Sequence, residues 1–390
     1  MRSLVVLVAL VLSACSAAGP SGGSSVAATT SPSHVGDPRP ISAGSSGTES
    51  TTSAEPSSTR SSTSVPPLRE PIVLGFAGDT SFTDGLAERD PLGQVATLLQ
   101  EPDLMVVNLE TAVADPAIGA PPVSKPFLFR SPPGSIDLLV AAGIDVVTLA
   151  NNHTLDFGPD ALRQTLVELD TRGFPRVGAG VDETAAYRPL VVDVGPWSVG
   201  LVSLSRVPCD WSASGQNVRP EVAWACDPFL ALADAAVAEA MAQSDLTVVL
   251  VHEGEEGVLC PSPFMTELNR HWAALGVDIV VNGHPHVVQG IRSVGDTLIV
   301  NSTGNFAFPP ARSVSANSGI FRFTVSDTPS GRPSLGWSLV PLRADGGMVT
   351  VPSTEQAEAI IDQVNAVSDG WQLDDRGQAH ADPGFSGTCR

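Results

Sequence analysis

The chain has 390 residues, and 42 Asp and Glu against 21 Lys and Arg give it a net charge of −21. Nucleic-acid binding depends on basic patches that neutralise phosphates, so this charge balance excludes nucleic acid as a partner. Lys125 is the only lysine in the chain. An anionic substrate would therefore need a bound cation or a local group of basic side chains.

The first 15 residues predict export. A short basic start, Met1–Ser3, precedes the apolar run Leu4–Leu12, which is shorter than the roughly 18 residues of a membrane span. The run ends in Leu12-Ser13-Ala14-Cys15, which resembles the lipobox of bacterial lipoproteins. We expect residues 1–15 to be a lipoprotein signal, and a lipid on Cys15 to tether the exported protein to the extracytoplasmic face of the cell membrane. The alternative is an ordinary secretion signal with a chance cysteine.

The composition changes twice beyond the signal. Residues 16–70 are mostly Ser, Thr, Gly, Pro and Ala, and they have too few large apolar side chains to form a core, so we expect a disordered stalk. Residues 71–344 carry regular apolar runs and are long enough for one large α/β domain, which we prefer to two smaller ones. Residues 345–390 are predicted to be a C-terminal extension with one helix, Thr354–Val367.

From Pro71 onward, short apolar runs alternate with helix-like segments, and this alternation predicts a layered α/β fold. The expected strands are Ile72–Ala77, Leu104–Val107, Val146–Ala150, Leu190–Val194, Val199–Ser203, Thr247–Val251, Asp278–Asn282, Leu298–Asn301 and Gly319–Val325. The expected helices are Leu92–Gln100, Ser135–Ala142, Asp160–Arg172, Phe229–Ala242 and Phe264–Leu275. We expect antiparallel pairs near Leu190–Ser203 and among the strands after Leu298, so two sheets or a mixed sheet are favoured over a purely parallel sheet.

Polar side chains follow the predicted strands at their carboxyl ends, which in open α/β sheets share the crevice where ligands bind. The segments are Gly78-Asp79, Asn108-Leu109-Glu110, Asn151-Asn152-His153 with Asp156, His252-Glu253-Gly254-Glu255-Glu256, His284-Pro285-His286 and Asn301–Phe306. Structural alternatives exist for several of them. They are a turn at Gly78-Asp79, a helix cap or turn at Asn108–Glu110, solvated carboxylates at Glu253 and Glu255, and a closing loop at Asn301–Phe306.

The pair His284 and His286 predicts a metal site, because neutral imidazole is the commonest protein ligand for transition metals and a short turn can aim both rings at one point. A solvated loop that carries two histidines is the alternative. Mixed His, Asp, Glu and Asn ligation suits Mn²⁺, Zn²⁺ or Fe better than Mg²⁺ or Ca²⁺. We therefore expect one or two divalent ions. A hydrolytic centre with two ions bridged by a carboxylate agrees with this set.

Four cysteines follow Cys15, and because an exported protein can form disulfides, they allow three pairings. We favour a bond between Cys209 and Cys226, which would close an irregular loop. The roles of Cys260 and Cys389 stay open.

Taken in order, the motifs resemble those of bacterial CapA proteins, also called PgsA, which serve capsule or poly-γ-glutamate biosynthesis. The matching segments are Gly78-Asp79, Asn108–Glu110, Ala150–His153, Asp156–Gly158, His252-x-Gly254-x-Glu256, His284–Val287 and Ser302-x-Gly304-Asn305-Phe306. The resemblance covers about Ile72–Phe308. It implies a metallophosphatase-like αββα sandwich with mixed sheets, related to calcineurin-type phosphoesterases.

The resemblance also implies roles for individual residues. The implied metal ligands are Asp79, Glu110, Asn152, His252, His284 and His286, with Glu110 as the bridging ligand. The implied catalytic pair is His153 with Asp156. The phosphoesterases have His where this chain has Ser81, and Asp where it has Glu110, so we expect one metal position to be weak or empty. Relative to CapA proteins, Glu253 replaces a Trp and adds charge beside the site, and Asn282 replaces a Gly.

Six further residues are candidate substrate ligands: Asn108, Lys125, Arg130, Glu256, Ser302 and Asn305. Lys125 and Arg130 belong to a segment that also resembles the family, and this basic pair could attract a carboxylate or a phosphate. Surface charge without a ligand is the alternative for both.

Three functions are compatible with these patterns. The first is a lipid-anchored protein that helps to synthesise, export or anchor an anionic polymer such as poly-γ-glutamate, alongside other capsule-synthesis membrane proteins. The second is a stand-alone metal-dependent hydrolase of a phosphoester or of an amide bond in a polymer or small anionic substrate. The third is a non-catalytic binding protein with a degenerate site.

Overall fold

The computed structural model describes residues 68–119, 125–207, 209, 221–309, 316–329 and 331–389. The predicted signal, the Cys15 lipobox and nearly all of the predicted stalk lie outside these residues. Within the described ranges, no helix is both long enough and apolar enough to cross a membrane.

The first sheet has seven strands, which are β1 (Ile72–Thr80), β2 (Leu104–Leu109), β5 (Val146–Thr148), β6 (Arg176–Val177), β13 (Asn317–Ser326), β14 (Ser334–Asp345) and β15 (Met348–Thr350). Their order is β15-β14-β13-β1-β2-β5-β6. Neighbouring strands among β1, β2, β5 and β6 pair in parallel. On its other side β1 pairs antiparallel with β13, and β13, β14 and β15 continue with antiparallel pairing. The sheet is therefore mixed.

The second sheet has six strands, which are β7 (Leu190–Val194), β8 (Trp197–Ser205), β9 (Leu246–His252), β10 (Ile279–Gly283), β11 (Ile291–Val294) and β12 (Thr297–Val300). Their order is β11-β12-β10-β9-β8-β7. The four inner strands are parallel, and both edge strands are antiparallel to their neighbours. Two short pairs complete the strands, β3 (Ala112–Val113) with β4 (Arg130–Ser131) and β16 (Asp369–Leu373) with β17 (Ala379–Ser386).

The helices are α1 (Ala96–Leu99), α2 (Ser135–Ala142), α3 (Gly158–Thr171), α4 (Glu183–Tyr187), α5 (Leu230–Gln243), α6 (Pro263–Leu275) and α7 (Thr354–Val367), with 3-10 turns η1 (Ala87–Arg89) and η2 (Gly93–Val95). Pro159 lies in the first turn of α3, where its missing N–H leaves no bond unmade. Ser353 and Gln356 form a capping box that begins α7. The helix predicted at Leu92–Gln100 is shorter than expected, because the chain forms η2 before α1 begins.

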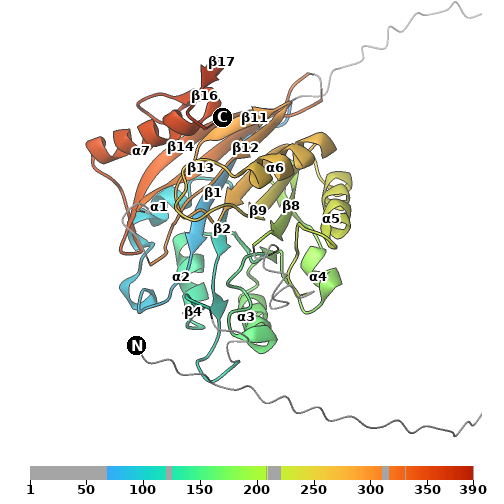
Figure 1. The fold of residues 1–390 in the computed structure, drawn as a ribbon, viewed down its shortest axis with the longest axis vertical. Helices are drawn as coiled ribbons and strands as arrows, with labels where there is room; N and C mark the ends of the chain where they lie inside the picture. The colour runs from blue at the N-terminus through green and yellow to red at the C-terminus, as the bar shows by residue number, and fades with distance from the viewer. Residues whose placement is uncertain are drawn as a thin grey trace, which may run out of the picture. The chain divides into compact units, whose positions relative to one another are not determined.

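Three apolar layers hold these elements together. Alternate residues of the strands face opposite ways, so Leu74 and Phe323 pack between the sheets with Leu201 and Ile279. The other face of the first sheet packs on α1, α2 and α3, and the other face of the second packs on α4, α5 and α6. Figure 1 shows α5 and α6 along β8 and β9. The predicted αββα sandwich with mixed sheets is confirmed.

One expected pairing is wrong. The strands predicted after Leu298 do not pair with each other, because β12 lies in the second sheet and β13 in the first. The antiparallel partner of β12 is β11, which the sequence pattern did not predict. The antiparallel pair expected near Leu190–Ser203 is present as β7 and β8.

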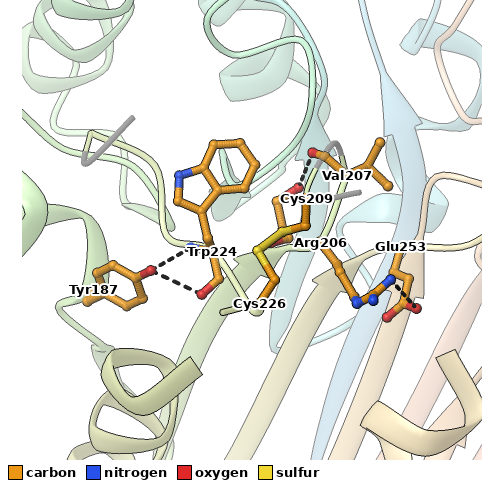
Figure 2. The surroundings of a disulfide bond; sticks show 8 residues. Tyr187, Arg206, Val207, Cys209, Trp224, Cys226 and Glu253 are labelled. Carbon is orange, nitrogen blue, oxygen red and sulfur yellow. Dashed lines mark hydrogen bonds and ion pairs between the residues drawn. A yellow bond between two sulfur atoms is a disulfide. The ribbon is translucent and has the colours of Figure 1, made fainter. Parts of the chain in front are cut away.

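Two disulfides join segments of the chain. The predicted bond between Cys209 and Cys226 is confirmed, and a second bond joins Cys260 to Cys389. Figure 2 shows the first disulfide beside Trp224, whose backbone N–H donates to the Tyr187 hydroxyl at 2.8 Å. The Tyr187 hydroxyl in turn donates to the carbonyl of Trp224 at 3.0 Å.

Backbone hydrogen bonds join the end of β1 to the segment that follows β12. The Asp79 N–H donates to the Gly304 carbonyl at 2.9 Å, and Phe306 N–H donates to the Asp79 carbonyl at 2.8 Å. A Cβ on Gly78 would lie 1.9 Å from the Gly304 oxygen. Glycine at position 78 is therefore required by this contact between backbones.

Replacement of Gly78 by Ala should destabilise the protein by about 1–3 kcal/mol, because the added methyl must push two backbone segments apart. Gly134→Ala is the matched control, since Gly134 has an ordinary φ and a Cβ added there would meet no atom within 4 Å beyond its chain neighbours. The measurement is the urea dependence of unfolding for both variants. Equal unfolding free energies for the two variants would contradict the expected clash.

Candidate metal centre

The parallel strands of both sheets end at one edge, and the polar segments predicted from the sequence meet there. Asp79 at the end of β1 is in register with Asn108 of β2. His252, the last residue of β9, is in register with Gly283 at the end of β10. Because the Asp79 backbone is bonded to the Gly304–Phe306 segment, the ends of the two sheets form a single site.

Glu110 is common to two groups of possible metal ligands. Glu110, His252 and His284 form one group, and Asp79, Glu110 and His286 form the other. Within each group the ligand atoms lie within 4.8 Å of one another. A carboxylate shared in this way is the arrangement expected of a ligand that bridges two cations.

Burial makes a cation a fitting occupant of this site. Asp79 and Glu110 are fully buried. Among the described residues, neither carboxylate oxygen of Glu110 has a hydrogen-bond partner, and the same holds for Nδ1 of the buried His284. An uncompensated buried carboxylate is costly. The donor set of carboxylates and imidazoles suits a divalent transition metal.

Asn152 extends the group that contains His252. Its Oδ1 lies 2.8 Å from Nε2 of His252, and the same Nε2 lies 3.3 Å from Oε1 of Glu110. This group therefore has four possible ligands, whereas the group with Asp79 has three. Ser81, which stands at the position of a phosphoesterase histidine, is buried, and its hydroxyl has no hydrogen-bond partner among the described residues.

The turn that carries His284 and His286 has an unusual backbone. The φ angles are 95° at His284 and 56° at His286, in the left-handed region that costs a non-glycine residue about 1–3 kcal/mol. The His284 N–H donates to Oδ2 of Asp79 at 3.2 Å, and this bond helps to hold the turn. The turn brings both imidazoles to the Glu110 carboxylate.

Two amide side chains orient the ligands. Nδ2 of Asn108 donates to Oδ1 of Asp79 at 2.8 Å and lies 3.2 Å from Nδ1 of His252. Oδ1 of Asn305 lies 2.8 Å from Nδ1 of His286. Outer contacts of this kind fix the rotamer and tautomer of metal ligands. Both residues were predicted as substrate ligands. The structure gives each a contact with a candidate metal ligand, and Oδ1 of Asn108 also accepts from the Thr148 hydroxyl at 3.1 Å and from Nδ2 of Asn151 at 3.0 Å.

Electrostatics separate the protonation states of the ligands. Burial opposes ionisation of Asp79, but the hydrogen bond and charge of His286 hold the pKa of Asp79 below its usual value. Burial and the nearby His252 and His286 hold the pKa of His284 well below its usual value. Burial also disfavours the charged form of His286, yet Glu110 and Asp79 raise its pKa to about 9. The lowered pKa favours the neutral form of His284, whereas a metal bound by His286 would have to displace its proton.

The predicted pair His153 and Asp156 lies beside the shared carboxylate. Nδ1 of His153 is 2.6 Å from Oδ2 of Asp156, and Nε2 of His153 is 3.8 Å from Oε1 of Glu110. Asp156 also accepts hydrogen bonds from Lys125 Nζ and from the Phe129 N–H. Lys125, predicted to attract an anionic substrate, is therefore engaged with Asp156, and it donates to the Asn152 carbonyl at 2.8 Å.

Two aromatic side chains that the sequence interpretation missed pack on the histidines. The ring centroid of Phe129 lies 4.1 Å from that of His153, and Phe308 stacks on His286 at 4.9 Å. Phe129 belongs to the segment Lys125–Arg130, whose family resemblance was the one available signal. These rings therefore flank two of the site's histidines.

The remaining predicted residues lie in different surroundings. Glu256 is exposed and groups with His284 and His286. The Arg130 guanidinium donates to the Asp115 carbonyl and lies 3.7 Å over the Phe157 ring. The Ser302 hydroxyl accepts from the Gly304 N–H at 3.1 Å. Among these contacts, only those of Glu256 are with the metal-ligand set.

The two departures from CapA proteins have local partners. Glu253 is buried rather than solvated, and its carboxylate lies 3.8 Å from Nη1 of Arg206, as Figure 2 shows. Arg206 therefore balances the charge added beside His252. The Asn282 side chain donates to the Val300 carbonyl at 2.8 Å.

Comparison with known proteins places this chain in a family. Residues 73–310 match the model of the family described as "Bacterial capsule synthesis protein PGA_cap". A "Probable polyglutamine synthesis accessory protein" of Mycobacterium tuberculosis is 32% identical over 238 residues, which cover 56% of this chain and 61% of that protein. The "PGA biosynthesis protein CapA" of Bacillus subtilis is 26% identical over 245 residues, with 62% of each chain covered.

This chain thus spans about three fifths of the length of these relatives. A solved structure of a phosphatase from Mycoplasma pneumoniae aligns with a TM-score of 0.43 and 16% identity, over 70% of this chain and 94% of that one. The family match covers more than half of the chain, and every candidate metal ligand lies within it. The chain therefore belongs to the bacterial capsule synthesis protein family PGA_cap.

Proposed function

We propose that this protein is an extracytoplasmic accessory protein for synthesis, export or anchoring of an anionic capsule polymer of the poly-γ-glutamate type. Cys15 carries the lipid that tethers it, the stalk of residues 16–70 holds the domain of residues 71–344 away from the membrane, and residues 345–390 extend that domain. Relatives named for polyglutamine synthesis, PGA biosynthesis or capsule biosynthesis support this role. Other capsule-synthesis membrane proteins are its proposed partners.

The observation that carries the proposal is the buried Glu110 carboxylate, which belongs to both ligand groups. One or two divalent ions would be held by Asp79, Glu110, Asn152, His252, His284 and His286. A bound divalent ion would act as a Lewis acid toward a phosphoryl or carbonyl oxygen. It would also attract an anion to a chain whose own net charge is −21.

The residues around the ions have separate tasks. Asp156 accepts the Nδ1 proton of His153, so a neutral His153 presents the Nε2 lone pair to the site. A proton gained there turns Nε2 into a donor for an oxygen or nitrogen that leaves the substrate. Lys125 donates a hydrogen bond to Asp156 and so helps to hold the carboxylate that orients the imidazole. Asn108 and Asn305 keep His252 and His286 aimed at the carboxylates.

A second candidate function is a stand-alone hydrolase of a phosphoester or of an amide bond in the polymer. The pairing of His153 with Asp156 at 2.6 Å favours it, because a histidine oriented by a carboxylate beside a metal site is equipped for proton transfer. Both functions use the same site. They differ in whether the protein turns over a substrate without partner proteins.

Addition of Mn²⁺ should stabilise the wild-type protein, by about 2.7 kcal/mol at roughly 100 times its Kd. Glu110→Gln should abolish this effect, because both groups of candidate ligands lose the carboxylate that they share. Asp79→Asn should remove only the Mn²⁺ bound by the group of Asp79, Glu110 and His286, which has fewer ligands and is expected to bind more weakly. The measurement is unfolding free energy with Mn²⁺ or with EDTA, together with metal content. Glu88→Gln, at an exposed carboxylate, is the control. Stabilisation of Glu110→Gln equal to wild type would contradict the proposed ligand.

His153→Ala should lower kcat on phosphoester or γ-glutamyl substrates by about 10²–10⁴-fold while metal content stays unchanged, because His153 belongs to neither ligand group. His271→Ala, at a half-exposed histidine on α6 paired with Asp234, should keep full activity. If wild type and His153→Ala turn over substrate equally, the proposed proton transfer is wrong. If no isolated substrate reacts, the accessory function is favoured over the stand-alone hydrolase.

Deletion of the gene should reduce the surface anionic polymer of the host cell. The wild-type gene should restore it, and a gene that encodes His284→Ala should not, because the turn after β10 supplies one histidine to each of the two ligand groups that share Glu110. Surface polymer is measured by extraction and quantification, with membrane-bound protein checked by immunoblot. Unchanged polymer after deletion would refute the capsule role.

A further inference from the structure

Glu256 lies on the loop that connects β9 to α6, and this loop approaches the metal centre from the solvent side. Its carboxylate belongs to a third group with His284 and His286, in which the ligand atoms lie within 4.8 Å of one another. The side chain is exposed, so packing against neighbours does not restrict its rotamers. The position of the backbone therefore decides whether the Glu256 carboxylate reaches the two histidines.

Two hydrogen bonds tie this loop to the histidine turn. The Gly257 N–H donates to the Pro285 carbonyl at 2.8 Å, and Nε2 of the buried Gln289 donates to the Val258 carbonyl at 2.7 Å. Gly254 also packs here, because its Cβ would lie 2.7 Å from the Pro285 ring and its φ is 126°. The loop and the turn thus meet on both sides of Glu256.

The third tether comes from the C-terminal segment. Cys260, four residues after Glu256, is bonded to Cys389. Before Cys389, the N–H groups of Gly387 and Thr388 donate to the carbonyls of Ser368 and Ala366, each at 2.9 Å. The tail is therefore fixed to the C-terminal end of α7 before it reaches the loop.

The same end of α7 contacts the chain just beyond the histidine turn. The Ile291 N–H donates to the Ser368 hydroxyl at 3.0 Å, and Gly290 allows close approach, since its Cβ would lie 2.5 Å from the Val367 backbone. Loop, disulfide, tail, α7 and histidine turn form a closed ring of contacts. In Figure 1 the C-terminus lies close to β11 and the β16–β17 pair.

We propose that Cys260–Cys389 and Gln289 are positioning groups that hold Glu256 beside His284 and His286, so that the C-terminal segment completes the cation site. Ala366, Ser368 and Cys389 all lie beyond residue 310, where the family match ends. The inference rests on the proposed metal-binding function. It assigns the disulfide a role in cation affinity in addition to its role in stability, and it requires the oxidising environment outside the cytoplasm.

The test compares Mn²⁺ affinities of the full chain, measured from the electron paramagnetic resonance signal of free Mn²⁺. The variants are Glu256→Gln, the double variant Cys260→Ser/Cys389→Ser and the combination of the three changes. Glu255→Gln, which removes an exposed carboxylate on the same loop, is the matched control. Circular dichroism and thermal unfolding establish that each variant is folded.

Glu256→Gln should weaken Mn²⁺ binding by roughly 10-fold, which is the size of effect typical when a residue that supports a metal site is replaced. Removal of the disulfide should weaken binding in the same direction and should add nothing in the Glu256→Gln background, because both changes act through one carboxylate. Glu255→Gln should bind as wild type does. If the disulfide variant does not fold, Gln289→Ala in the wild-type and Glu256→Gln backgrounds tests the second tether in the same way.

Three results would overturn the inference. Wild-type affinity in the disulfide variant would show that the tail does not act on the site. Independent, multiplicative losses from the disulfide and Glu256 changes would show that the disulfide does not act through Glu256. Unchanged affinity in Glu256→Gln would show that Glu256 is not part of the cation site, while Mn²⁺ binding itself would stand. Absence of Mn²⁺ binding by the wild-type protein would instead refute the proposed metal-binding function.

Discussion

The carboxylate of Glu110 is the constraint on which the rest of the site depends. It is fully buried, it has no hydrogen-bond donor among the described residues, and it is shared by both ligand groups. A charge in such a place needs compensation, and the nearest candidates are the imidazoles of His252, His153 and His286. The arrangement fits a cation site, because a bound divalent ion would compensate the buried carboxylate in place of the missing hydrogen-bond donors.

Glu110 lies near candidate ligands from both sheets, Asp79 from the first and His252, His284 and His286 from the second. The contact between the sheets depends on Gly78, which lets β1 approach Gly304, and on the strained backbone of His284 and His286. The hydrogen bond from the His284 N–H to Asp79 helps to offset the backbone strain of the histidine turn. The bond from the Asp79 N–H to the Gly304 carbonyl joins the first sheet to the segment that follows β12, and Asn305 of that segment contacts His286 on the turn after β10. The site thus lies on the seam between the sheets and is held there by hydrogen bonds from both.

The central strands were predictable, because strands buried on both faces appear as continuous apolar runs. β14 was not, since it contains Pro341 and only part of it is buried. Two-residue strands such as β3 and β6 carry no periodicity at all. The gathering of polar side chains at one edge was predictable from their positions at strand ends, whereas the candidate ligands among them were chosen from the family resemblance. The engagement of Lys125 with Asp156 and the location of Arg130 over Phe157 were not predictable, because a charged residue in a loop has many possible partners.

The sequence by itself determined the alternation of strands and helices, the polar residues at the strand ends and the membership of a family, because these follow from local pattern and ordered motifs. Only the tertiary structure decided which ligands share Glu110, that Arg206 balances Glu253, and that Cys260 is joined to Cys389. These pairings link residues far apart in the chain. Their partners are selected by the packing of the two sheets and of α7, which no local pattern specifies.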